Sequence, residues 1–320
     1  MNFWKKLKLS SVPFFVLAPM DGVTDFVFRE IISEIAKPDV LFTEFTNVDA
    51  LFSDGYERTI PRLRYSEQQR PIVAQIWGIN PENFYNTAVL INKLGFDGID
   101  INMGCPDRSV MKMGSGISLL NNPSLASEII TATKEGSKET PVSVKTRIGV
   151  EYIVTETWIK FLLEQKLDAL TVHGRTAKEL SGVPTHWDQI KRSVEIRNQV
   201  SPDTVIVGNG DVLDRKEATK VSELFGVDGI MIGRGVFSNP WLFEKPTREH
   251  VSKGCLELLL KHTKLYCETY SESKKFDVMK KFFKVYVRSF NGAGILKKQL
   301  MEAKDYLEVE NVVKAYLLNS

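Results

Sequence analysis

The sequence predicts a TIM barrel, built from eight β/α units, followed by a small all-helical domain. Short apolar runs rich in Val and Ile, typical of parallel strands buried on both faces, recur eight times before residue 233. Helix-like stretches separate these runs, and no strand-like run follows Pro246. We therefore expect a barrel domain over residues 1–243 and a helical domain over residues 244–320.

The strands are predicted from runs bounded by polar or turn-forming residues. These runs cover residues 14–17, 40–42, 71–75, 98–101, 142–145, 169–172, 205–207 and 229–232. A doubly wound open sheet is the alternative, and it usually carries a Gly-rich phosphate loop after its first strand. Here the first run ends in Ala18-Pro19-Met20-Asp21-Gly22, which is not such a loop, so the pattern favours a closed barrel.

Helix signals lie between the runs. Asn80 and Asn122 each precede a proline, which is the pattern of an N-cap with Pro in the first turn. Residues 249–317 are typical of three or four helices, with breaks near 271–273 and 291–294. The helices predicted for the barrel cover residues 25–36, 80–94, 122–134, 155–166, 187–198 and 214–225.

Charge is unevenly distributed along the chain. Residues 245–320 hold 15 basic and 9 acidic residues, against 27 and 31 in the remainder. Lys280, Lys284 and Arg288 are four residues apart, which predicts a basic stripe along one helix face. Such a stripe is either an ordinary solvated face or a surface for a polyanion.

Composition excludes several classes of protein. The chain is 43% hydrophobic and 26% charged, which argues against a disordered chain, and it has no apolar run long enough to cross a membrane. The first eight residues are too polar for a signal peptide. Cys105, Cys255 and Cys267 lack metal-like spacing and cannot all pair, so we expect no structural metal and a reducing, cytoplasmic location.

Polar or reactive residues follow nearly every predicted strand. Because the reactive groups of a β/α barrel lie at the C-terminal ends of its strands, these residues are expected to meet at one mouth. In chain order they are Pro19 and Met20, Glu44, Gln75, Asn102 and Cys105, Lys145 and Arg147, His173 and Arg175, Asn209 to Asp211, and Gly233 with Arg234.

The last two predicted strands end in glycine-containing segments. Gly208-Asn209-Gly210-Asp211 and Gly233-Arg234-Gly235 allow the backbone to approach a ligand closely. Barrels often bind phosphate with the loops after strands seven and eight, and Arg234 can add a charged contact. The alternative is that both segments are simply tight turns.

Lys145, His173 and Cys105 are the candidates for chemistry. Lys145 and His173 offer positive charge and donors to an electron-rich ring such as a reduced flavin, although Lys145 also suits a Schiff-base nucleophile. Cys105 lies between glycines beside Pro106, whereas most lone cysteines are small buried hydrophobes. A thiol is mostly protonated at neutral pH, since its unperturbed pKa is about 8.5, and this suits a proton donor.

Together these motifs resemble the tRNA-dihydrouridine synthase family, in order from about residue 15 to 243. The matching segments are 17–25, Thr43-Glu44-Phe45, 100–106 (Asp-Ile-Asn-Met-Gly-Cys-Pro), 143–147 (Ser-Val-Lys-Thr-Arg), 171–176 (Thr-Val-His-Gly-Arg-Thr), 208–211 and 231–235. The segments around Cys105 and His173 are fairly specific, whereas many flavin barrels share the Gly-Arg segment.

The resemblance implies an FMN-dependent reductase that converts uridines of tRNA to 5,6-dihydrouridine. It implies NADPH as the reductant of FMN, hydride transfer from flavin N5 to C6 and proton transfer from Cys105 to C5. Residues expected around the flavin ring are Pro19, Met20, Gln75, Lys145 and His173, with Asp21 also assigned to the cofactor. Asn209, Gly210, Asp211, Gly233 and Arg234 are expected to hold the phosphate end. Asn102 and Arg175 are expected to bind substrate, and Lys280, Lys284 and Arg288 to contact tRNA.

The sequence departs from the family pattern at two positions, and several rival functions are still possible. Arg108 stands where the family often has lysine, and Leu180 stands where many members have an aromatic residue, which leaves the role of residues 176–187 open. The rivals are another FMN-dependent barrel reductase, an aldolase that uses Lys145, and a tRNA-binding factor without catalysis.

Overall fold

The computed structural model describes residues 1–9, 13–248, 250–271 and 273–318. Its contacts divide the chain into a barrel unit and a helical unit. The barrel unit comprises Met1–Phe26 and Pro38–Gly235, and the helical unit comprises Val27–Lys37 and Val236–Ser320. The domain assignment of 1–243 and 244–320 stays a prediction.

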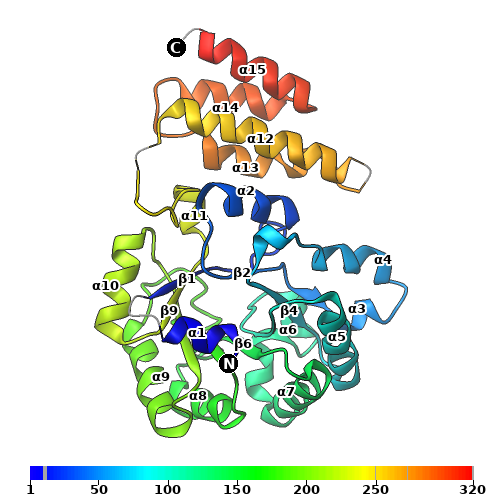
Figure 1. Cartoon of the computed structure of the whole chain (residues 1–320), viewed down its shortest axis with the longest axis vertical. Helices are drawn as coiled ribbons and strands as arrows, with labels where there is room; N and C mark the ends of the chain where they lie inside the picture. Colours follow the sequence, from blue (N-terminus) through cyan, green and yellow to red (C-terminus); the bar gives the residue numbers. More distant parts are fainter. Residues whose placement is uncertain (10–12, 249, 272, 319–320) are drawn as a thin grey trace. The chain divides into compact units, whose positions relative to one another are not determined.

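The barrel unit contains a ring of parallel strands, each hydrogen-bonded to the next (Figure 1). The order around the ring is β1-β9-β8-β7-β6-β5-β4-β2. Val16 of β1 also bridges Val40, next to β2, so the two ends of the sheet meet and the ring is nearly closed. The bounds are β1 Phe14–Leu17, β2 Leu41–Phe42, β4 Ile72–Trp77, β5 Gly98–Met103, β6 Val142–Arg147, β7 Ala169–His173, β8 Val205–Asn209 and β9 Gly229–Ile232.

The predicted TIM barrel is therefore confirmed, with one addition. Every predicted run contributes to a barrel strand, because uninterrupted apolar runs suit strands buried on both faces. The two-residue strand β3 (Thr46–Asn47) pairs with β4 beyond the end of β2, through Thr46 beside Ile76 and Asn47 beside Trp77. It was not predicted, because two residues carry no periodic signal.

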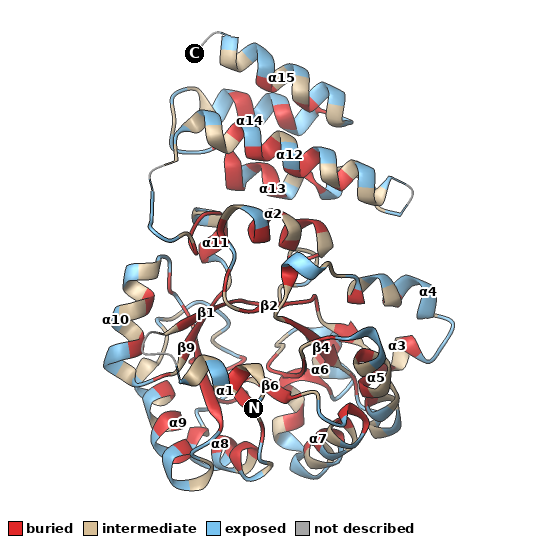
Figure 2. Cartoon of the chain, viewed as in Figure 1, coloured by how far each residue is buried: buried red, intermediate tan, exposed pale blue. Residues whose placement is uncertain are grey.

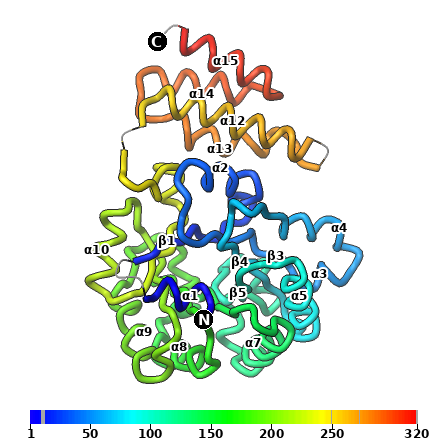
Figure 3. The backbone as a smooth tube through the Cα atoms, viewed as in Figure 1, coloured from blue at the N-terminus to red at the C-terminus, as the bar shows by residue number. Residues whose placement is uncertain are grey.

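Helices alternate with the strands around the barrel, as the backbone trace shows (Figure 3). They bury an inner face and leave the outer face to solvent (Figure 2). Asn80 and Asn122 are N-caps as predicted, since their side chains accept hydrogen bonds from Glu82 N and Leu125 N. The bounds are α1 Phe3–Lys8, α3 Val48–Leu51, α4 Tyr56–Thr59, α5 Pro81–Leu94, α6 Arg108–Lys112, α7 Pro123–Ser137, α8 Thr155–Glu164, α9 Trp187–Val200 and α10 Arg215–Phe225, with 3₁₀ turns at Ile60–Leu63, Glu67–Gln69 and Gly116–Asn121. The next helix, α11 (Gly235–Ser238), belongs to the helical unit except for Gly235.

The short helix α1 covers the N-terminal end of the barrel. Trp4 is fully buried in a cluster with Phe14, Ala169 and Val205, which are the first residues of three strands. Lys8 Nζ donates a hydrogen bond to the carbonyl oxygen of Pro202, at 2.6 Å. The opposite, C-terminal end of the strands is therefore the one left for a ligand.

The helical unit contains most of α2 (Phe26–Ala36) together with α12 Ser252–Tyr270, α13 Lys280–Tyr286, α14 Ala293–Glu302 and α15 Tyr306–Leu318. The helix predicted at 25–36 is present, but its buried residues pack within this unit. Phe28 stacks on Phe282 with ring centroids 5.5 Å apart, and Glu34 pairs with Lys261. Apolar burial therefore groups α2 with helices more than 200 positions later in the chain.

The predicted single face of Lys280, Lys284 and Arg288 is wrong. Helix α13 ends at Tyr286, and Val287 leaves the helical conformation with φ −103° and ψ 85°. Val287 is buried, so tertiary packing of this apolar residue overrides the four-residue spacing. Arg288 therefore lies outside the helix that carries Lys280 and Lys284.

No helix within the described residues combines the length and the apolar character needed to cross a bilayer.

Candidate functional site

A pocket of about 160 Å³ opens at the C-terminal ends of the barrel strands. It brings together predicted residues from five different strand ends, as a barrel mouth should. The lining residues are Pro19, Phe45, Gln75, Asn102, Gly104, Cys105, Pro106, Lys145, Arg147 and His173.

A second pocket of about 430 Å³ lies beside the first, and Phe45 and Cys105 line both. Phe45 and Trp77 meet edge to face in its wall, with ring centroids 5.8 Å apart. Asp21, predicted to contact a cofactor, lines this second pocket and pairs with Arg62 at 2.5 Å. Cys105 is thus the one predicted catalytic group that faces both cavities.

A chain of buried hydrogen bonds runs beneath the first pocket. Ser143 Oγ donates to Asp100 Oδ1 at 2.6 Å, and Gln75 Nε2 donates to Asp100 Oδ2 at 2.8 Å. Asn102 Nδ2 donates to Gln75 Oε1 at 3.1 Å, and Asn102 Oδ1 accepts from the backbone N–H of Cys105 at 2.9 Å. The loop that carries Cys105 is therefore connected to the interior of the barrel through three side chains.

Lys145, which is half-buried, and Asp100, which is fully buried, carry opposite charges and influence each other's pKa without forming an ion pair. Burial lowers the pKa of Lys145 to about 8, with Arg147 adding to the effect, while Asp100 opposes it. Burial likewise raises the pKa of Asp100 to about 6, against the hydrogen bonds from Ser143 and Gln75. Lys145 makes no hydrogen bond or ion pair with any residue that the structure describes, so its ammonium group is available to a ligand.

The loop after β5 holds Cys105 half-buried. Burial raises the pKa of its thiol above the ordinary value, and the Asp107 N–H, Lys145 and Arg147 oppose that rise. Gly116 sits at φ +61°, and an added Cβ there would meet the carbonyl oxygen of Cys105 at 2.7 Å. The thiol is consequently protonated at neutral pH and held close to a backbone that only glycine permits.

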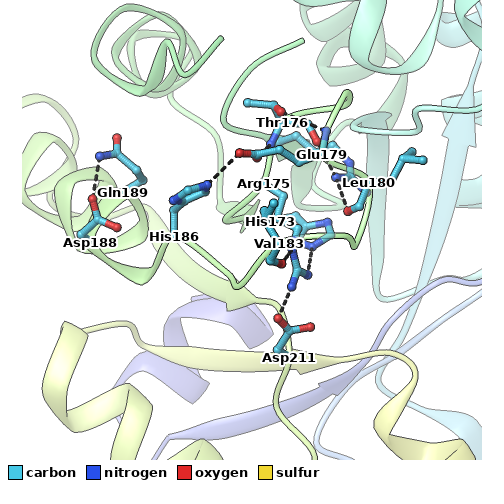
Figure 4. A network of polar contacts seen from close by, with 11 residues as sticks. His173, Arg175, Thr176, Glu179, Leu180, Val183, His186, Asp188, Gln189 and Asp211 are labelled. Carbon is cyan, nitrogen blue, oxygen red and sulfur yellow. Dashed lines mark hydrogen bonds and ion pairs between the residues drawn. The ribbon is translucent and has the colours of Figure 1, made fainter. Parts of the chain in front are cut away.

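His173 and Arg175 form a second cluster after β7 (Figure 4). Arg175 Nη1 lies 3.3 Å from His173 Nε2, so Nε2 is the acceptor and the proton of the neutral ring is on Nδ1. Burial, followed by the charges of Arg147 and Lys145, lowers the pKa of His173 far below its ordinary range. His173 is therefore a neutral donor through Nδ1–H.

Arg175 is almost completely buried, and each of the three nitrogens of its guanidinium group makes one polar contact. It pairs with Asp211 and donates through Nε to the carbonyl oxygen of Val183 at 2.7 Å (Figure 4). Its predicted role in substrate binding stays a prediction, and the observed contacts orient His173 and the loop after β7.

The loop 176–187, whose role was open, is organised by Glu179. Its carboxylate accepts from the backbone N–H of Thr176 at 2.8 Å and contacts His186 Nε2 at 2.9 Å (Figure 4). Leu180, which stands in place of an aromatic residue, is 55% exposed and adopts φ +51°. The loop thus presents an exposed aliphatic side chain on a frame fixed by polar contacts.

The residues at the ends of β8 and β9, which are predicted to hold a phosphate, make several contacts within the protein. Asn209 Nδ2 donates to the carbonyl oxygen of Met231 at 2.8 Å, and Asp211 lies 3.4 Å from Arg234 Nη2. Gly210 sits at φ +143°, where an added Cβ would overlap the side chain of Thr185. An added Cβ at Gly233 would lie 3.6 Å from the sulfur of Met20, so these two predicted residues are neighbours.

In the helical unit, the predicted tRNA contacts have different environments. Lys280 is mostly buried and pairs with Asp277 at 2.8 Å, whereas Lys284 and Arg288 are exposed. Lys274 lies over the ring of Tyr270, 3.7 Å from its centroid. Of the two predicted tRNA contacts on α13, Lys284 is accordingly more accessible than Lys280.

Three contributions to the site were missed from sequence. Asp100 belongs to a motif that matches the family, and an acidic residue inside an apolar strand is itself a signal of a functional role. Arg147 stands at the end of its strand with no sequence pattern that predicts its contacts, and Trp77 lies beyond the predicted end of its strand. Within the described residues, no group of three or more His, Cys, Asp or Glu could hold a metal ion.

The mouth of this (β/α)8 barrel combines a protonated thiol, an ammonium group that has no partner among the described residues, and a neutral imidazole. Groups of this kind at the mouth of such a barrel are suited to enzymatic proton transfer. The solved structures that resemble the chain include morphinone reductase in complex with tetrahydroNAD (TM-score 0.50, 14% identity, 74% of this chain and 87% of that one) and a variant of NCR from Zymomonas mobilis (TM-score 0.50, 18% identity, 75% and 89%). At this identity the likeness shows the fold alone.

The similarity to known sequences identifies the family, which the likeness to solved structures does not. The family model described as dihydrouridine synthase (Dus) matches residues 16–320. A "Probable tRNA-dihydrouridine synthase" of Staphylococcus aureus (strain COL) is 45% identical over 98% of this chain and 95% of the relative. "Probable tRNA-dihydrouridine synthase 2" of Bacillus subtilis (strain 168) is 45% identical over 96% and 94%. The chain belongs to the dihydrouridine synthase family, as its motifs indicated.

Proposed function

We propose that this chain reduces the C5–C6 double bond of uridines in tRNA to give 5,6-dihydrouridine, with FMN as cofactor and NADPH as reductant. Family membership and the names of the relatives support the reaction. The observation that carries the catalytic assignment is that Cys105 lines both pockets of the barrel mouth. A proton donor between the two pockets can reach a nucleobase that is bound beside a cofactor.

The residues of the first pocket suit a flavin. Lys145 is a half-buried ammonium group that has no partner among the described residues, and a reduced flavin carries negative charge at its pyrimidine end. The neutral ring of His173 offers an Nδ1–H donor at the same mouth. Near the predicted phosphate end, Gly210 lets the backbone pack directly against Thr185. When bound and reduced, FMN supplies the hydride that is added at C6 of uracil.

Cys105 would then deliver a proton to C5. Its thiol stays protonated at neutral pH because burial raises its pKa. Negative charge that develops on the uracil ring during reduction makes C5 basic enough to accept this proton. Lys145 and Arg147 lie close enough to Cys105 to influence its pKa, so the thiolate left behind is stabilised by two cations until solvent reprotonates it.

Asn102 is the residue best placed to hold the base beside Cys105. It shares the first pocket with the thiol and accepts the hydrogen bond of the Cys105 backbone N–H. The target uridine must leave its stack to reach this pocket, which costs a few kcal/mol. Contacts of tRNA phosphates with exposed cations such as Lys284 and Arg288 would offset that cost. The cytoplasmic location stays a prediction.

The test begins with the absorption spectrum of the purified protein and the identity of any flavin released on denaturation. NADPH oxidation should then depend on unmodified tRNA and yield dihydrouridine. Cys105→Ala should retain FMN and its reduction by NADPH while losing about 10²–10⁴-fold in turnover, the usual contribution of a general acid. Cys267→Ala, at a half-buried cysteine of the helical unit, is the matched control. A protein that binds no flavin, or a Cys105→Ala variant with normal turnover, would overturn the assignment.

A further inference from the structure

The loops after β6 and β7 are joined along their backbones into one surface, the loop shelf, formed by residues 148–154 and 175–182. Three backbone hydrogen bonds connect the two segments, from Ile148 to Arg175, from Ala177 to Gly149 and from Lys178 to Val150, with the donor named first. Arg147, which lines the first pocket, precedes the first segment and donates to carbonyl oxygens of the second, those of Thr176 and Leu180. The loop shelf therefore begins at the edge of the pocket.

Hydrogen bonds hold the loop shelf in place although it stands at the surface. The Val154 N–H donates to the carbonyl oxygen of Ile148 at 2.8 Å and closes the first segment into a tight turn. An added Cβ at Gly149 would overlap the carbonyl oxygen of Tyr152, so this turn requires glycine. Glu179 fixes the second segment by accepting a backbone hydrogen bond within it (Figure 4). A ligand of the loop shelf would therefore have little backbone to order.

The loop shelf exposes large apolar side chains. Tyr152 is 76% exposed, and Ile153 beside it and Leu180 on the second segment are 42% and 55% exposed. Tyr152 is the only aromatic residue of the loop shelf, and its side chain makes no hydrogen bond or ring contact within the described residues. Single exposed apolar residues are common, but three of them on two joined segments beside a pocket indicate a binding surface.

The chemistry of the loop shelf favours a nucleobase as the ligand. Its exposed charged residues, Lys178 and Glu151, have opposite signs, so the shelf offers a polyanion little net attraction. A stable protein interface takes roughly 20–30 residues on each side, far more than this surface provides. The planar ring of Tyr152 suits a base, because every base has a π-face that can stack on an aromatic side chain.

We propose that Tyr152 stacks on the base adjacent to the target uridine in the RNA chain. When the uridine leaves its stack to enter the pocket, the adjacent base loses a stacking partner. The ring of Tyr152 replaces that partner, and Ile153 and Leu180 extend the apolar surface around it. The proposal rests on the proposed function, because it takes the neighbouring pocket as the place where the uridine is reduced.

The direct test is a double-mutant cycle between protein and RNA, read as binding of the holoenzyme to unmodified tRNA transcript. Two further transcripts carry an abasic nucleotide, one on the 5′ side and one on the 3′ side of the uridine found to be modified. Tyr152→Ala should weaken binding of the intact transcript about tenfold, and one abasic transcript should bind the parent about tenfold more weakly. With that transcript Tyr152→Ala should cause no further loss. Independent losses with both abasic transcripts would overturn the proposal.

The kind of contact is tested by further variants and by salt. Tyr152→Phe should bind the intact transcript as the parent does, whereas Tyr152→Leu should lose most of the affinity that Tyr152→Ala loses, because it keeps apolar area without a planar ring. The slope of log K against log salt should be the same in Tyr152→Ala as in the parent, since no phosphate contact is removed. Full affinity in Tyr152→Leu, or a flatter slope in Tyr152→Ala, would contradict stacking.

Tyr85→Ala is the matched control, because Tyr85 is a tyrosine on the surface of α5 with 42% exposure, and this variant should bind RNA normally. Sedimentation equilibrium tests for a protein ligand. Self-association that is lost in Tyr152→Ala while RNA binding is unchanged would assign the loop shelf to a second copy of the chain and overturn the proposal.

Binding without turnover separates this proposal from the proposed function. Weaker binding of Tyr152→Ala at an unchanged salt slope, together with a parent that makes no dihydrouridine, would reject the function and retain a stacking surface. Normal RNA binding and normal kcat/KM in Tyr152→Ala, with a parent that makes dihydrouridine, would reject the stacking alone. A parent that binds no tRNA would reject both.

Discussion

The guanidinium group of Arg147 donates through Nε to the carbonyl oxygen of Gly104 at 3.1 Å and through Nη1 to that of Thr176 at 2.9 Å. Nη1 also lies 3.1 Å from the carbonyl oxygen of Leu180. One buried side chain thus joins the loop that carries Cys105 to the loop after β7. The positions of the thiol and of the exposed loop are mechanically coupled through it.

This coupling predicts that Arg147→Ala lowers kcat/KM for tRNA by about 10²-fold, the effect of a misplacement of about 1 Å at a reacting group. Arg147→Lys keeps a charge near Cys105 but cannot reach three carbonyl oxygens, so it should lose nearly as much. Steady-state kinetics with unmodified tRNA measure both, and anaerobic flavin reduction by NADPH is the control that should not change. Near-normal activity of Arg147→Lys would show that charge alone matters at this position.

The pH dependence of the reaction should carry a basic limb set by Lys145. Burial lowers its pKa to about 8, so the ammonium form is present below that pH and is lost as the pH rises through it. The thiol of Cys105 has a raised pKa and stays protonated over the same range. Turnover should therefore fall above about pH 8.

Lys145→Arg checks this assignment, because guanidinium stays protonated throughout. The basic limb in the pH profile of kcat should disappear or move upward, whatever the loss in absolute rate. A limb that stays near pH 8 in this variant would assign it to another group.

Gly210 should be intolerant of any side chain. Its φ of +143° is strained for other residues, and an added Cβ would overlap Thr185. Gly210→Ala should cost about 1–3 kcal/mol of stability and weaken FMN retention, both measurable by thermal unfolding and by flavin content after dialysis. Gly254→Ala, in helix α12 with nothing within 4 Å of the added Cβ, is the matched control and should be neutral or slightly stabilising.

Lys284 should contribute more to tRNA binding than Lys280. Lys284 is exposed, whereas Lys280 is mostly buried and paired with Asp277 at 2.8 Å. Lys284→Glu should weaken binding by roughly tenfold at low salt and flatten the salt dependence, since fewer counterions are released. Filter binding over a salt series measures this, with Lys264→Glu on α12 as a control of equal charge change. Equal effects of Lys264→Glu and Lys284→Glu would indicate that the exposed face of α13 is an ordinary solvated surface.

The barrel could be predicted because each of its strands is a local apolar run. Two of the elements that were not predicted show why: α1 has Trp4 as its only buried residue, and β3 is two residues long, so neither has a local signal. The end of α13 was placed wrongly because the spacing of Lys280, Lys284 and Arg288 says nothing about where Val287 packs.

The sequence by itself determined the fold class and which side chains stand at the strand ends, since both follow from patterns within a few residues. Only the tertiary structure decided how those side chains pair. Asp211 faces Arg175 and Arg234, and the amide of Gln75 is oriented by Asp100, 25 positions away. Hydrogen bonds and ion pairs depend on distances of about 3 Å between groups that are remote in the chain. Closure of the barrel sets those distances, and no local pattern encodes them.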